Sequence, residues 1–169
     1  MRQLILLTIL LLPSLTWACS VPPRTLSLTN SDLVRSAEII VLAKAINYTA
    51  KNETRSRILD FTFDVEKILK GELEKTISLP GYNASEIENS PGNFGNHMNP
   101  EFWAFDAGNS IQFGNCVAYG LFETGKSYLL IIASKSHTRA YEQVSSLDDL
   151  WYKTIELLVL NENLDEKYN

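Results

Sequence analysis

The chain is poor in the side chains that most often bind metals. It has two cysteines, Cys19 and Cys116, and two histidines, His97 and His137. His97 and Glu101 could share a metal ion, but two ligands without a third make a weak site, so we expect an ordinary packed loop histidine there. His137 stands among serine and lysine residues, and we expect it in a solvated turn.

Concentrated positive charge is also missing. The formal net charge is −5, the sequence pI is near 5.1, and lysine and arginine form no cluster. Because binding to a nucleic-acid backbone needs concentrated positive charge, we expect no nucleic-acid partner.

Patterns of common catalytic sites are absent as well. The sequence has no glycine-rich phosphate loop, no nucleophile elbow and no zinc-protease helix. Asp60, Asp64 and Glu66 alternate along one segment, and we interpret them as the solvated face of a strand, because catalytic carboxylates need a cleft that raises one pKa. We therefore expect the protein not to be an enzyme, and to have no cofactor of its own.

The amino terminus has the layout of a secretory signal. Arg2 precedes an apolar run over residues 4–12, and Pro13 and one small residue, Ala18, precede Cys19, so residues 1–18 are predicted to be a signal peptide. The run is shorter than the ~20 residues of a transmembrane helix. The mature protein is expected to be secreted, or periplasmic or in the cell envelope if the source is bacterial. A lipoprotein signal also ends at a cysteine, so lipidation of Cys19 is an alternative that would bring the protein to a membrane.

Cleavage after Ala18 makes Cys19 the new amino terminus. Its free α-amine titrates near neutrality and, together with the carbonyl oxygen of the same residue, can chelate a metal ion. In an exported chain the two cysteines favour one disulfide, Cys19–Cys116, with two free thiols as the alternative. Three segments, at Asn47, Asn52 and Asn83, match the acceptor pattern for N-glycosylation, which matters only in a eukaryotic secretory pathway.

The pattern of apolar residues predicts a mainly β domain over residues 19–169. Residues 57–70 read as a long half-exposed strand, because Leu59, Phe61, Phe63 and Val65 alternate with polar side chains. Residues 38–46 form a continuous apolar run typical of a strand buried on both faces. Further strands are predicted at residues 76–79, 117–122, 127–133 and 140–144, with turns at 70–72 and 123–126, a polar loop at 47–56 and an ordered, aromatic-rich insertion at about 83–113.

Two helices flank these strands. Residues 29–37 predict a short capped helix with Asp32 near its positive end. Ser146 and Asp149 form a predicted capping box, and an amphipathic helix follows, with an acidic tail from Asn161. Its expected buried positions are Leu147, Leu150, Trp151, Ile155, Leu158 and Val159. Short strands of unequal length flanked by two helices fit a closed or nearly closed β-barrel better than a parallel α/β sheet.

The order of these segments resembles a known family. Cys19-Ser20-Val21-Pro22-Pro23, the short helix, the strand at 38–46, the long strand ending in Lys70-Gly71, Cys116, and Gly125-Lys126 before the strand at 127–133 are similar in order to the amino-terminal domain of tissue inhibitors of metalloproteinases. Those domains are netrin-like OB-folds, so the resemblance implies an OB-fold-like barrel. Residues 83–113 are an insertion without counterpart, and Val21 stands where the family has a further cysteine.

The resemblance also implies a function. In the family the terminal cysteine chelates the catalytic zinc of the target protease, which makes Cys19 the expected chelator, Ser20 the residue in the specificity pocket, Val21 and Pro22 the binding ridge, and Cys116 the disulfide partner. A neutral amine and a carbonyl oxygen can displace the zinc-bound water at the open position of a catalytic site. The expected partner is a zinc metalloprotease. The alternative is an extracellular or envelope interaction module with an unknown protein partner and no inhibitory activity.

Overall fold

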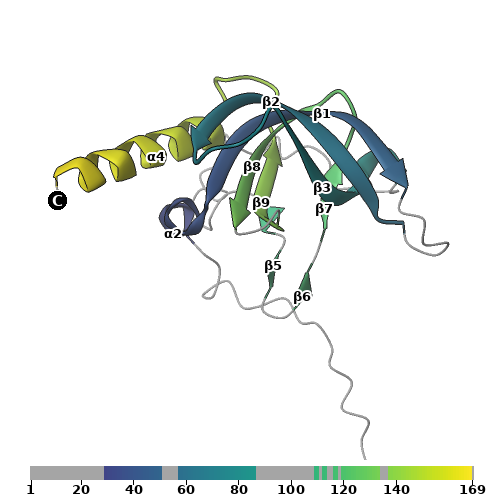
Figure 1. Cartoon of the computed structure of the whole chain (residues 1–169), viewed down its shortest axis with the longest axis horizontal. Coiled ribbons are helices and arrows are strands. Elements are labelled where there is room, and N and C mark those ends of the chain that lie inside the picture. Colours follow the sequence, from purple (N-terminus) through teal and green to yellow (C-terminus); the bar gives the residue numbers. More distant parts are fainter. Residues whose placement is uncertain are drawn as a thin grey trace, which may run out of the picture.

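A curved sheet that closes into a nearly complete barrel forms the body of the molecule (Figure 1). The computed structural model describes residues 29–50, 57–86, 109–110, 112–113, 116–117, 119–133 and 137–168. Seven strands follow the order β4-β9-β8-β1-β2-β3-β7, and a separate pair is formed by β5 and β6. The elements are α2 (Asn30–Ser36), β1 (Ile39–Ala50), β2 (Leu59–Lys70), β3 (Thr76–Asn83), η3 (Ala84–Glu86), β4 (Asn109–Ser110), β5 (Gln112–Phe113), β6 (Cys116–Val117), β7 (Gly120–Phe122), β8 (Ser127–Ala133), β9 (His137–Gln143) and α4 (Leu150–Tyr168).

This architecture confirms the predicted fold class, a mainly β, nearly closed barrel with a short helix before it and a longer helix after it. Antiparallel pairing joins β1 to both β2 and β8. The strand β9, next to one end of the sheet, contacts β7 at the other end, since the Tyr141 hydroxyl of β9 accepts a hydrogen bond from the Leu121 amide of β7 at 2.9 Å. The Tyr141 ring also lies 5.1 Å from the Phe122 ring of β7, centroid to centroid.

The long strand β2 shows why its sequence alternates. Phe61 and Phe63 are fully buried, whereas the alternating residues Thr62 and Asp64 are only half-buried. Successive side chains of a strand point to opposite faces, so this period of two places one row inside the barrel and the other outside. The predicted strand and its facing are therefore confirmed.

The central strand β1 is buried on both faces, as its continuous apolar run predicts. Ile40, Val41, Leu42 and Ala43 are all buried. The strand is longer than expected, however, since it continues to Ala50 through positions assigned to a polar loop. Pairing with β2 from Asn47 to Ala50 holds these exposed residues in extended conformation, which local polarity alone does not predict.

The inner face of the sheet encloses one of two hydrophobic clusters, named here the barrel core. Its buried members come entirely from strands and are Val41, Ala43, Ala45, Phe61, Phe63, Leu79, Phe122, Tyr128, Leu130, Ile132 and Tyr141. Phe122 lies at its centre, with ring centroids 5.0 Å from Phe63 and 5.2 Å from Tyr128 in edge-to-face contacts. Glycines at 81 and 120 permit this position, because a Cβ at either would lie within 2.5 Å of the Phe122 ring.

The outer face carries the second cluster, the helix-side core, where α2 and α4 cover the sheet. Its buried members are Leu33, Val34, Ala37, Ile40, Leu42, Leu129, Ile131, Ala140, Val144, Trp151, Tyr152, Ile155 and Val159. Trp151 and Ile155 of α4 have no exposed surface, which confirms two of the predicted core positions of the last helix.

The turn after β2 requires glycine. Gly71 has φ of +80°, and a Cβ there would lie 2.3 Å from the Glu38 carbonyl oxygen. Only glycine adopts this conformation at so close an approach without strain. The predicted turn at Lys70-Gly71 thus brings the end of β2 against the start of β1.

Other predicted boundaries are wrong. The helix α4 starts at Leu150, and the Asp149 carboxylate accepts a hydrogen bond from the Tyr152 amide at 2.9 Å, so Asp149 rather than Ser146 is the cap. Leu147 and Leu150 are 58% and 42% exposed, so they are not core residues. The helix also continues past Asn161, where an acidic tail was expected.

Two strands are also longer than predicted. The strand β3 continues to Asn83, past Pro80 and Gly81, and so includes the first position of the expected insertion. The strand β9 begins at His137, which pairs with Ala133 and is therefore not in a turn. Residues 87–108, the greater part of the expected insertion, lie outside the described residues.

Candidate functional site

The residues predicted to contact a protease, Cys19, Ser20, Val21 and Pro22, lie outside the described residues. The described chain begins at Thr29, ten residues after Cys19. An extended segment of that length reaches about 33–36 Å. What the structure defines is the residue to which this segment is joined, Thr29 at the start of α2.

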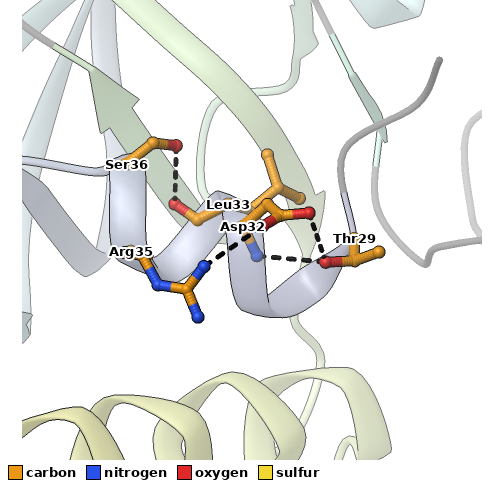
Figure 2. A network of polar contacts seen from close by, with 5 residues as sticks. All are labelled: Thr29, Asp32, Leu33, Arg35 and Ser36. Atoms are coloured by element: carbon orange, nitrogen blue, oxygen red, sulfur yellow. Dashed lines mark hydrogen bonds and ion pairs between the residues drawn. The ribbon is translucent and has the colours of Figure 1, made fainter.

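Side-chain contacts fix the first turn of α2 (Figure 2). The Thr29 hydroxyl accepts a hydrogen bond from the Asp32 amide at 3.1 Å and donates one to the Asp32 carboxylate at 2.7 Å. The same carboxylate forms an ion pair with Arg35, with 3.4 Å between Arg35 Nη1 and Asp32 Oδ1. An N-cap threonine satisfies an amide that has no partner within the helix, and the carboxylate lies at the positive end of the helix dipole. The predicted capped helix is therefore confirmed.

Contacts from α4 and β2 hold this helix against the barrel. Trp151 Nε1 donates a hydrogen bond to Asn30 Oδ1 at 3.1 Å. Lys70 Nζ donates to the Val34 carbonyl oxygen at 2.8 Å and to Glu162 at 2.7 Å. Because the lysine and the glutamate are each about one-fifth exposed, this ion pair is better shielded from water than an ordinary surface pair. One lysine thus joins α2, β2 and α4.

A hollow of about 200 Å³ lies between the two helices. Its lining combines polar and apolar side chains, namely Ser31, Val34, Arg35, Leu158, Asn161 and Glu162. The hollow adjoins the Lys70–Glu162 pair. Two of its lining residues, Val34 and Glu162, therefore also make the contacts with Lys70 that hold α2 in place.

The predicted disulfide partner Cys116 lies in β6, opposite Phe113 of β5. The β5–β6 pair and α2 both lie on the lower side of the sheet in Figure 1. No disulfide occurs between residues that the structure describes, and Cys19 is not one of them. The Cys19–Cys116 bridge therefore stays a prediction.

Among the predicted acceptor sites, Asn47 is exposed on β1, and Asn83 is half-buried at the end of β3. The Asn83 side-chain oxygen accepts hydrogen bonds from the amide and the hydroxyl of Ser85 at 3.2 and 2.8 Å. Asn52 and His97 lie outside the described residues. Within the described ranges, no three residues of the types that ligate metals are grouped closely enough to hold an ion.

Sequence reasoning missed one buried acidic side chain, Glu142 of β9, which has no exposed surface. Its neighbours at a spacing of two, Ala140 and Val144, both belong to the helix-side core. That period of two was a usable signal, since it places Glu142 on the same face as two apolar residues.

Burial also raises the pKa of two tyrosines, Tyr128 and Tyr141, in the barrel core. Desolvation raises the pKa of Tyr128 to about 12, although its hydroxyl accepts a hydrogen bond from the Glu123 amide at 2.8 Å. Desolvation likewise raises the pKa of Tyr141. Both phenols therefore act as neutral acceptors, Tyr141 for the Leu121 amide within β7 and Tyr128 for the Glu123 amide just after it.

Comparison with models of known protein families and with curated proteins finds no match to this chain. The family resemblance therefore rests on the order of the segments alone. In the part of the chain that the structure describes, neither helix is long and apolar enough to span a membrane.

Proposed function

We propose that the mature protein is a secreted, netrin-like binding protein that inhibits a zinc metalloprotease through the amine and carbonyl of Cys19. The observation that carries the proposal is the fixed start of α2. Thr29, Asn30 and Val34 are held by contacts within the helix, from α4 and from β2, respectively. A segment that leaves a rigid point loses less entropy on binding than a free tail does.

The chemistry of the proposal needs only groups of the terminal residue. A catalytic zinc site keeps a coordination position that water occupies. A neutral amine nitrogen and the adjacent carbonyl oxygen can take that position as a chelating pair, while Ser20 enters the pocket beside the zinc. Val21 and Pro22 would then extend along the cleft, where the fixed φ of proline limits their movement.

The barrel supplies the support for this arrangement. The segments that carry the family resemblance include the capped helix, the strand β1, the turn at Lys70-Gly71 and the strand β8 after Gly125. These segments lie next to one another, because β1 pairs with β2 and with β8 and Lys70 reaches α2. The proposed disulfide from Cys19 to Cys116 would hold the terminus against the same body.

The test is inhibition of a panel of zinc proteases by protein whose first residue is Cys19. We expect inhibition by this form and a loss of at least about a hundredfold when one alanine precedes Cys19, because the amide that replaces the amine cannot chelate. A matched control carries the additional alanine after Asn169 and keeps full inhibition.

Two outcomes contradict the proposal. Equal inhibition with and without the amino-terminal alanine excludes chelation by the terminal amine. If no form inhibits any protease, the alternative function remains, which is an interaction module without inhibitory activity. Intact mass of the exported protein gives a third result, since acylation of Cys19 blocks the amine and identifies a lipid-anchored protein.

A further inference from the structure

The last helix carries apolar side chains on two opposite sides. Trp151, Ile155 and Val159 are buried against the sheet. A second row is exposed: Leu150, Leu157, Leu160 and Leu164 have 42%, 61%, 54% and 52% of their surface in contact with solvent. At 3.6 residues per turn, Leu157 lies about 160° around the helix from both Ile155 and Val159. We name the four exposed leucines the leucine face.

The spacing of the leucine face matches a helix–helix seam. Leu150, Leu157 and Leu164 recur every seven residues, and Leu160 lies between the last two. A seven-residue apolar repeat keeps one stripe of a helix facing a partner helix over successive turns. The helix projects beyond the barrel in Figure 1, so a second helix has access along its length.

Charged side chains of α4 between Leu150 and Leu164 are paired within the molecule. Lys153, which lies among the leucines, is bound by Asp148 at 2.6 Å, and Glu156 is bound by Lys67 at 2.7 Å. Glu162 lies on the side of the helix toward α2, where Lys70 binds it at 2.7 Å. Over this part of the helix, two copies can therefore bring their leucine faces together without opposing unpaired charges of like sign.

We propose that the leucine face is a self-association surface on which α4 of a second copy packs in antiparallel orientation. Centred on Leu157, this pairing places Leu157 opposite itself, Leu150 opposite Leu164 and Lys153 opposite Asn161. A membrane surface is a poorer partner, because helices that bind in the lipid interface have lysine and arginine on the polar side. The inference does not depend on inhibition of a protease.

A contact made by one helix per copy is small. Specific interfaces below about 1,200 Å² in total are at the weak end of the size range, so we expect a reversible, concentration-dependent dimer. The experiment is analytical ultracentrifugation of the mature protein, residues 19–169, across about three decades of concentration. A monomer–dimer equilibrium is the expected result.

Leu157→Glu is the decisive variant, because it places two carboxylates opposite each other at the centre of the pairing. We expect it to raise the dissociation constant of the dimer at least about tenfold. Ile46→Glu on β1 is the matched control, since Ile46 is 47% exposed but lies on the barrel. The control is expected to change the constant less than about threefold. Circular dichroism checks that both variants fold.

Cysteine cross-linking tests the orientation. In the antiparallel pairing Leu157→Cys forms a disulfide with its counterpart, whereas Leu164→Cys does not, because it lies opposite Leu150. Cross-linking of both variants indicates parallel helices and overturns the arrangement. A monomer at every concentration, a dimer that Leu157→Glu leaves unchanged, or Leu157-dependent binding to phosphatidylcholine–phosphatidylglycerol vesicles by a monomeric protein overturns the proposal.

Discussion

The two hydrophobic cores lie on opposite faces of the same sheet and differ in what they hold together. All buried members of the barrel core come from strands, and its centre is a group of aromatic rings at centroid distances of 5.0 to 5.5 Å around Phe122. The helix-side core is mostly aliphatic and draws Trp151, Tyr152, Ile155 and Val159 from α4. The first core closes the barrel, whereas the second attaches the helices and thereby the start of the described chain.

Because of this difference, damage to the barrel core and damage to the helix-side core have different effects on the fold. Loss of the barrel core removes the surface on which the helices pack, so both cores fail together. Loss of a helix-side contact leaves β1, β2 and β8 with their own pairing and their aromatic interior. The attachment of α2 can therefore be weakened while the barrel stays folded, but the barrel cannot be weakened without loosening α2 as well.

The largest effect is expected at the centre of the barrel core. Phe122→Ala removes a fully buried ring that contacts Phe61, Phe63, Tyr128 and Tyr141. Because the backbone at Gly81 and Gly120 is already in contact with the ring, the cavity cannot close easily. We expect a loss of about 3–5 kcal/mol in the free energy of unfolding, measured by urea denaturation.

The contrasting variant is Trp151→Ala, at a fully buried residue of the helix-side core that also binds Asn30. Hydrogen exchange distinguishes the two variants. We expect Phe122→Ala to accelerate exchange in β8 and α2 alike, and Trp151→Ala to accelerate it in α2 and α4 while β8 stays protected. Equal loss of protection in β8 for both variants would show that the two cores fold as one unit.

An intermediate effect is expected from the tyrosine that links β8 to the segment after β7. The pKa of Tyr128 is about 12 in the folded protein and about 10 in an unfolded chain. The folded state keeps the phenol proton where the unfolded chain has lost it, so stability is complete below about pH 10 and falls as the pH rises toward 12. This difference in pKa corresponds to about 2–3 kcal/mol of folding stability.

Tyr128→Phe tests this dependence. The variant loses the acceptor for the Glu123 amide and is expected to be about 1 kcal/mol less stable at pH 7. Between pH 10 and 12, however, its stability should decline less steeply than that of the unmodified protein. Tyr48→Phe is the control, because Tyr48 is 38% exposed and should leave the decline unchanged. Parallel curves for Tyr128→Phe and the unmodified protein would exclude this residue as the cause.

The comparison of the two cores also explains which features the sequence predicts. Strict alternation places Phe61 and Phe63 inside the barrel, because a period of two admits only one choice of inner face. The helix α4 offers two apolar rows at helical spacing, so local periodicity cannot decide between Leu150 and Trp151; burial against β1, β8 and α2 decides it. Ser146 and Asp149 are both good caps, and the same packing selects Asp149.

For the candidate site, the sequence predicts the local features but not the contacts between distant segments. The cap at Thr29 follows from local residue types, and the structure confirms it. The contacts that hold the helix, Lys70 to Val34 and Trp151 to Asn30, join residues far apart in the chain, so no local pattern predicts them. The roles of Cys19 and Ser20 depend on a partner protein, and only binding experiments can test them.

The smallest effect is expected at that cap. Thr29→Ala removes the acceptor for the Asp32 amide and one hydrogen bond to the Asp32 carboxylate, which should cost about 1 kcal/mol, largely within α2. Thr29→Ser retains the hydroxyl and should restore most of the loss. Hydrogen exchange in the first turn of α2 is the measurement, with β8 as the internal reference. Because the cap contacts neither core, faster exchange in β8 would contradict the separation of the helix-side contacts from the barrel.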